Sequence, residues 1–121
     1  TSEFLRNFIF ENCRLLACVG LKENTFRPFT PTKTSVVLLQ KWKSNKEKTN
    51  DYKIFMADSE RPGKDNSGNY IYLKDKEGNY INEKKEIIDT LKTPRVVDHD
   101  LDQIIEEFNK FKNKENINFN E

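Results

Sequence analysis

The chain has 121 residues, of which 35% are hydrophobic and 34% are charged, and its formal net charge is +1. A chain of this length forms one domain or part of one, and this composition leaves only a small apolar core. The sequence has no run of about 18 apolar residues and no signal-peptide pattern at its start, which argues against a membrane protein or a secreted protein. We therefore expect a soluble, cytoplasmic protein.

The first 21 residues predict a helix followed by a buried strand. Apolar side chains recur with helical spacing over residues 3–13, at Phe4, Leu5, Phe8 and Ile9. Residues 15–21 then form a continuous apolar run of strand length. A helix that leads into a buried strand is typical of an open α/β sheet. The chain opens within this helix and its only methionine is Met56, so we expect it to be a piece of a longer protein.

Residues 26–42, with the sequence FRPFTPTKTSVVLLQKW, predict a stiff proline-containing loop that leads into a second strand. The apolar run 36–39 does not alternate with polar residues, which indicates a strand buried on both faces. Loops held by a rigid sheet often carry binding groups. This loop is therefore the first candidate for a site.

Charge is unevenly distributed along the chain. Residues 22–53 carry eight basic and three acidic side chains, whereas residues 98–121 carry three basic and seven acidic ones. A basic region favours phosphate groups through steering and counterion release. The alternative is a solvated, lysine-rich loop without a partner.

The remaining segments predict shorter elements. Residues 52–57 indicate a third strand near an edge of the sheet, paired antiparallel with the second strand because a parallel crossover needs a dozen or more residues. Residues 70–73 and 80–81 flank a glycine-containing turn and predict a hairpin. Residues 83–92 predict a short helix. A last helix begins near a capping-box pair, Asp100 and Gln103, and we find no internal repeat.

Few residues indicate chemistry. His99 is the only histidine, so no Cys/His metal set is possible, and its place suggests a helix start. Asp98, Asp100 and Asp102 surround the same helix N-terminus, where carboxylates favour the helix dipole. We find no nucleotide-binding, hydrolase or metalloprotease motif. Accordingly, we expect no metal site and no catalytic or cofactor-binding residue in this chain.

The order of several segments nevertheless resembles one family. The segments are FLRNFIFENCRLLACVGL at 4–21, the stretch 26–42 with its Lys33-Thr34-Ser35 entry, YKIFMA at 52–57 followed by Gly63-Lys-Asp65 and Gly68, and VDHDL at 97–101. In this order they resemble the modification subunits of type I restriction-modification systems. The resemblance covers nearly the whole chain. Within that family, the segments are similar to the late part of an adenine-N6 DNA methyltransferase domain.

This resemblance implies an α/β fold that is a fragment of a Rossmann-like class I methyltransferase sheet. Residues 15–21 would be the sixth strand and residues 35–42 the antiparallel last strand, with an extra strand, a hairpin and a C-terminal helix after them. The domain would cover residues 1–112, and residues 113–121 would form a frayed tail.

The resemblance also implies that the parent protein is an S-adenosylmethionine-dependent, site-specific DNA adenine-N6 methyltransferase. Its cofactor-binding and Asn-Pro-Pro-Tyr/Phe motifs would lie upstream of Thr1. The chain alone is thus expected to be inactive and to bind no S-adenosylmethionine.

The stretch 26–42 would form one wall of the pocket that holds an adenine extruded from the duplex. An aromatic wall stacks on the base. The family often has an aromatic residue near the end of this strand, so here the role falls to Leu39, Phe29, Trp42 or a residue outside the chain. The residues expected to face the base pocket or the DNA are Phe29, Thr32, Lys33, Thr34, Leu39 and Gln40. Those expected at the DNA backbone are Arg27, Lys41, Lys43 and Lys46.

The implied partners are double-stranded DNA and the DNA-specificity and restriction subunits of the same system. An unpaired strand edge would make the isolated chain prone to pair with a second copy. Two alternatives stay open. One is a non-catalytic docking module whose acidic last helix contacts the DNA-specificity subunit, and the other is a related methyltransferase that acts on RNA or protein.

Overall fold

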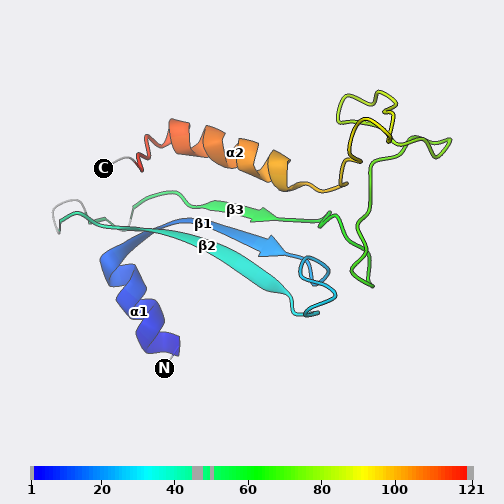
Figure 1. Ribbon diagram of the computed structural model, residues 1–121. Coiled ribbons are helices and arrows are strands. Elements are labelled where there is room, and N and C mark those ends of the chain that lie inside the picture. Colours follow the sequence, from blue (N-terminus) through cyan, green and yellow to red (C-terminus); the bar gives the residue numbers. More distant parts are fainter. Residues whose placement is uncertain (1, 45–47, 50, 120–121) are drawn as a thin grey trace.

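The computed structural model describes residues 2–44, 48–49 and 51–119. These residues form an α/β fold with one three-stranded mixed sheet and two helices (Figure 1). In chain order the elements are α1 (Ser2–Asn12), β1 (Cys13–Leu21), β2 (Thr34–Lys41), β3 (Phe55–Asp58) and α2 (Leu101–Lys114). Within the described residues, neither helix is long and apolar enough to cross a lipid bilayer.

The strand β1 lies at the centre of the sheet. It pairs antiparallel with β2 on one side, from Cys13 opposite Lys41 to Leu21 opposite Thr34, and parallel with β3 on the other. The antiparallel pairing of the first two strands confirms the sequence prediction. Leu16, Ala17 and Leu21 of β1 are buried, so the small core is centred on this strand.

The expectation that residues 36–39 form a strand buried on both faces is wrong. Val36 and Val37 are 53% and 52% exposed, and β2 is an edge strand in the order β2-β1-β3. Within the described chain no strand pairs with its outer edge. An apolar run predicts a strand, but its burial depends on what covers it.

The third strand pairs with a different neighbour from the one expected. It runs antiparallel to β2 in direction, yet it pairs with β1 in the parallel sense. The connection between Lys41 and Phe55 has 13 residues, which is long enough for the chain to pass β1 and reach the far edge. The expected edge position is confirmed.

The two helices lie on opposite sides of the sheet (Figure 1). On the α2 side, the Phe55 ring of β3 contacts the Phe108 ring in an edge-to-face arrangement, with 5.5 Å between the ring centroids. On the α1 side, Phe4 and Phe8 of the helix remain 77% and 56% exposed. Apolar side chains remain exposed on both faces, since Val36 and Leu38, which line a groove with Phe108 on the α2 side, are 53% and 38% exposed.

The N-terminus of α2 is held differently from the predicted capping box. Asp100 occupies the N-cap position, but its side chain makes no capping hydrogen bond. Instead, its carboxylate accepts hydrogen bonds from Ser59 Oγ (2.7 Å), Glu60 N–H (2.7 Å) and Arg61 N–H (3.1 Å). His99 Nδ1 accepts the hydrogen bond from Leu101 N–H at 3.1 Å. Asp100 thus ties the segment after β3 to the start of α2.

The chain segment after α2 is attached to the rest of the protein. Ile117 is only 8% exposed, and the Phe119 ring stacks on the Phe108 ring with 6.4 Å between centroids. Gln40 Nε2 of β2 donates to the carbonyl oxygen of Asn118 at 2.9 Å. Residues 113–119 therefore do not behave as the frayed tail expected for 113–121, and residues 120–121 lie outside the described residues.

A ten-residue repeat, which the sequence analysis did not find, lies between β3 and α2 (green to yellow in Figure 1). Residues 64–71 and 74–81 share the pattern Lys-Asp-x-x-Gly-Asn-Tyr-Ile. In both copies the aspartate Oδ1 accepts hydrogen bonds from the N–H groups two and four residues later. Gly68 and Gly78 both have φ of +88°, which glycine adopts without steric cost.

A third turn of the same kind replaces the helix expected at 83–92. The Asn82 Oδ1 atom accepts hydrogen bonds from Lys84 N–H and Glu86 N–H. Lys85 has φ of +66°, which is incompatible with a right-handed helix. That expectation is wrong because an Asx turn competes with helix formation at this site.

We predict that Asp100→Ala lowers the free energy of unfolding by about 2 kcal/mol, because Ser59, only 2% exposed, would lose the acceptor for its hydroxyl group. Asp102→Ala is the matched control: this exposed carboxylate lies in the first turn of the same helix and contributes only a dipole interaction of about 0.5 kcal/mol. Chemical denaturation measures both values. Equal losses in the two variants would contradict the role given to Asp100.

The Asp100 carboxylate also makes the free energy of unfolding depend on pH. Burial raises the pKa of Asp100, but the hydrogen bonds from Ser59, Glu60 and Arg61 outweigh burial and leave the pKa below its ordinary value of 3.8. A lowered folded-state pKa stabilises the fold above the unfolded-state pKa, and this contribution is lost as the pH falls through the folded-state value. We therefore expect Asp100→Asn to lose less unfolding free energy than the wild type as the pH falls below about 4. Parallel pH profiles of the two proteins would disprove this linkage.

Candidate nucleic-acid interface

The connection between β1 and β2, here called loop 22–33, is a series of tight turns. Thr25 N–H donates to Lys22 O, Arg27 N–H to Asn24 O, and Phe29 N–H to Phe26 O, at 3.0 to 3.2 Å. The two ends of the loop are fixed because Leu21 pairs with Thr34 in the sheet. The internal turns and the paired ends give the loop a defined shape at one end of the sheet.

Four of the expected site residues lie on this loop. Phe29 is 90% exposed, and Lys33 is also exposed. Arg27 is half-buried, and its Nε donates to Asn24 Oδ1 at 3.0 Å. The Thr32 hydroxyl lies 2.9 Å from Thr30 Oγ1, so it helps to order the loop.

Thr34, at the start of β2, is placed differently from these four residues. Its Oγ1 atom is buried and has no hydrogen-bond partner among the described residues. The hydroxyl group therefore does not present itself at the surface for a phosphate group.

The other expected residues lie at the far end of β2. An eight-residue strand is roughly 25 Å long, so Lys41 is separated by about that distance from Lys33. Lys43 follows Lys41 and is exposed, and Lys46 lies outside the described residues. The expected residues thus form two separate groups, one at each end of the strand.

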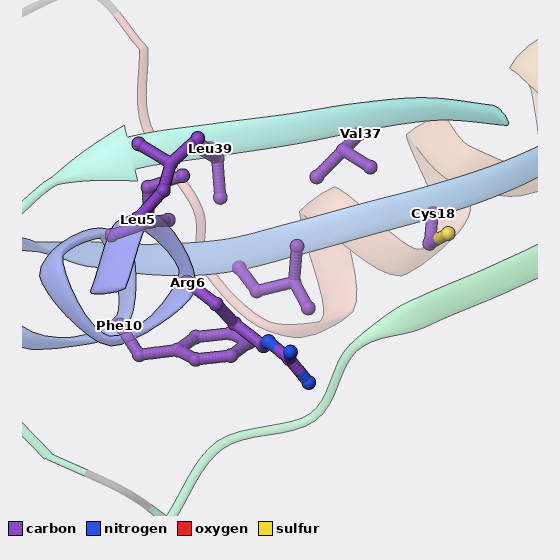
Figure 2. Close-up of a pocket in the computed structure, with 8 residues that line it drawn as sticks. Leu5, Arg6, Phe10, Cys18, Val37 and Leu39 are labelled. Carbon is purple, nitrogen blue, oxygen red and sulfur yellow. The ribbon is translucent and has the colours of Figure 1, made fainter. Parts of the chain in front are cut away.

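Leu39 does not face the loop. It lies beside α1 and lines an apolar groove of about 310 Å³ between this helix and the sheet, together with Leu5 and Val37 (Figure 2). Trp42 packs edge-to-face against Tyr52, with 6.0 Å between ring centroids. Of the three candidates for a base-stacking residue, Phe29 therefore has by far the most exposed side chain.

The sequence analysis missed the contact between loop 22–33 and the first copy of the repeat. Asn24 Nδ2 donates to Asn66 Oδ1 at 3.0 Å, and Lys64 Nζ donates to the carbonyl oxygen of Arg27 at 2.9 Å. The signal that could have drawn attention to this segment is the repeat itself, whose two copies are ten residues apart. The partnership with the loop, however, spans about forty residues and has no local signature.

Loop 22–33 carries three basic residues, Lys22, Arg27 and Lys33, and one acidic residue, Glu23. The carboxylate of Asp65 is turned into its own turn, where the backbone N–H of Asn69 lowers its pKa. Lys22 is paired with Glu60 at 3.1 Å. Arg27 and Lys33 remain as cationic groups on either side of the exposed Phe29 ring in sequence.

An exposed aromatic ring with flanking cations can stack on a base and attract phosphate groups. Across the described residues, no group of three or more His, Cys, Asp and Glu side chains is arranged to hold a metal ion. Comparisons with protein-family models, with curated proteins and with solved structures find no match to this chain.

Proposed function

We propose that this chain is the late part of the methyltransferase domain of a type I restriction-modification modification subunit, and that loop 22–33 faces the DNA. The observation that carries the proposal is the 90% exposed Phe29 on an ordered loop between two cationic residues. An exposed aromatic ring offers a flat surface on which another ring can stack. A flipped or unpaired base is a partner with a matching flat surface.

The edge of β2 supports the first part of the proposal, because a domain fragment implies that the sheet continues beyond this chain. Val36 and Val37 are about half exposed, and the outer edge of β2 is unpaired within the described residues. Long apolar strand edges recruit another strand. In the parent methyltransferase, an earlier strand of the same sheet would occupy this edge.

The contribution of this chain to methyl transfer would be to hold the DNA. S-adenosylmethionine, bound by upstream residues of the parent, would supply the methyl group. Phe29 would stack on the target base or on a neighbouring base, while Arg27 and Lys33 would attract the backbone phosphates. A rigid loop keeps these side chains in position, so little ordering is left to occur when the DNA binds.

We predict that Phe29→Ala raises the Kd for a fluorescent duplex with one unpaired adenine by about tenfold, because base stacking on an aromatic ring contributes about 1–3 kcal/mol. Phe29→Trp should bind as well as the wild type. Fluorescence anisotropy at low ionic strength measures the affinity. Phe4→Ala is the matched control, since Phe4 is 77% exposed on α1, away from the loop.

Two outcomes would count against the proposal. Equal affinities of the Phe29→Ala and Phe4→Ala variants would remove the DNA-facing role of the loop. Methyl transfer to the duplex by the isolated chain would show that the catalytic groups do not lie upstream.

The edge of β2 gives a separate prediction. An antiparallel copy centred on Val37 would place Lys33 opposite Lys41 of the copy, and like charges directly opposite each other are destabilising. Self-association of the isolated chain should therefore be weak and should increase with salt, which screens the lysines. Analytical ultracentrifugation should also show that Val37→Lys abolishes it, whereas Leu91→Lys, at a site 94% exposed, does not. Association that falls with salt would contradict this pairing.

A further inference from the structure

We propose that the first copy of the ten-residue repeat is a brace that positions loop 22–33. The positioning residues are Lys64 of the repeat and Asn24 of the loop. The brace itself follows from contacts within the chain. Only its consequence for DNA binding rests on the function proposed above.

The first copy contacts the loop through hydrogen bonds and one close backbone approach. Lys64 Nζ donates to Arg27 O at 2.9 Å, and Asn24 Nδ2 donates to Asn66 Oδ1 at 3.0 Å. At Gly68 the two segments approach so closely that an added β-carbon would lie 2.5 Å from the backbone nitrogen of Pro28. Two of these contacts, at Arg27 and Pro28, lie on the backbone immediately before Phe29.

Asn24 connects the brace to the cationic side chain of the loop. Its Nδ2 group binds the repeat, while its Oδ1 atom accepts a hydrogen bond from Arg27 Nε at 3.0 Å. The same amide therefore orients the guanidinium group on one side and holds the turn of the repeat on the other. The backbone of Arg27 is held by Lys64 and its side chain by Asn24.

Comparison of the two copies separates the contacts that form the repeat itself from the contacts that hold the loop. Both copies have the same Asx turn, and in both the lysine lies over a tyrosine ring, at 5.4 Å for Lys64 over Tyr70 and 5.0 Å for Lys74 over Tyr80. A β-carbon added at Gly78, however, would meet no atom within 4 Å. The turn and the cation–π pair thus belong to the repeat, whereas the contacts with Arg27 and Pro28 belong to the first copy.

The second copy also supplies the matched control for an experiment. Lys64→Met and Lys74→Met each remove one positive charge and one cation–π contact, but only Lys64→Met removes the hydrogen bond to Arg27 O. Amide hydrogen exchange of Phe29 and Thr30, measured by NMR, reports on the position of the loop without any DNA. Both amides donate to Phe26 O in the turn that follows the braced residues.

We expect Lys64→Met to accelerate exchange at these two amides by about tenfold, as the loss of a hydrogen bond from a charged group implies. Lys74→Met should leave it within about twofold of the wild type, since surface changes away from the contact have small effects. Asn24→Ala, which keeps every lysine, should also accelerate exchange. Equal exchange in the Lys64→Met and Lys74→Met variants, or unchanged exchange in both Lys64→Met and Asn24→Ala, would overturn the brace.

The consequence for DNA is measured separately with the duplex carrying an unpaired adenine. If the loop faces DNA, the Kd should rise several-fold more for Lys64→Met than for Lys74→Met, although both variants have the same net charge. Faster exchange with equal affinities of the two variants would leave the brace in place and would overturn the DNA-facing role of the loop. The two hypotheses therefore fail in distinguishable ways.

Discussion

The pairing of β1 on both of its edges is the constraint on which the rest of the structure depends. Over residues 17–20, β1 has a neighbouring strand on each edge, and its side chains can be covered from two faces. Leu16, Ala17 and Leu21 of this strand are buried, whereas β2 and β3 each have a single neighbouring strand among the described residues. Loop 22–33 takes its position from the end of β1, and the Asp100 contact fixes α2 to the segment that follows β3. Both regions thus take their position from the central strand.

Sequence patterns predicted the elements whose cause is local. The helical spacing of apolar residues over 3–13 corresponds to α1, and the apolar run 15–21 corresponds to most of β1. The antiparallel direction of residues 35–42 was expected only from the family resemblance, and the pairing of β1 with β2 agrees with it. The helix and the strand depend on residues close together in the chain, so a pattern in one window contains enough information.

Most features that the sequence did not reveal depend on partners far away in the chain. The capping pattern at Asp100 was present, but Ser59 and two backbone N–H groups compete for the same carboxylate. The apolar run of β2 gave no indication of which faces would be covered. The helix expected at 83–92 failed for a local reason, since Asn82 forms a turn that the apolar spacing of Ile87 and Ile88 concealed.

The candidate site divides in the same way. Phe29 and Lys33 could be identified because proline-rich loops next to strands expose their side chains. Leu39 could not be placed, because the alternation of a strand depends on register, and one position changes the face to which a side chain points. The groove between α1 and the sheet, not the loop, receives this residue.

The exposed apolar side chains indicate where the rest of a larger protein would pack against this chain. On the α2 side of the sheet, the Phe55 and Phe108 rings are in contact, although Val36 and Leu38 remain 53% and 38% exposed. On the other side, Phe4 and Phe8 of α1 are largely exposed, and the groove beside Leu39 is open. The unpaired edge of β2 borders this groove, so a strand added there would extend the sheet and would bring covering side chains to the same open face. Large exposed apolar surfaces mark interaction sites. Under the proposed function one addition, the earlier part of the methyltransferase sheet, would satisfy both the strand edge and the open face, and loop 22–33 at the end of β1 would stay accessible to DNA.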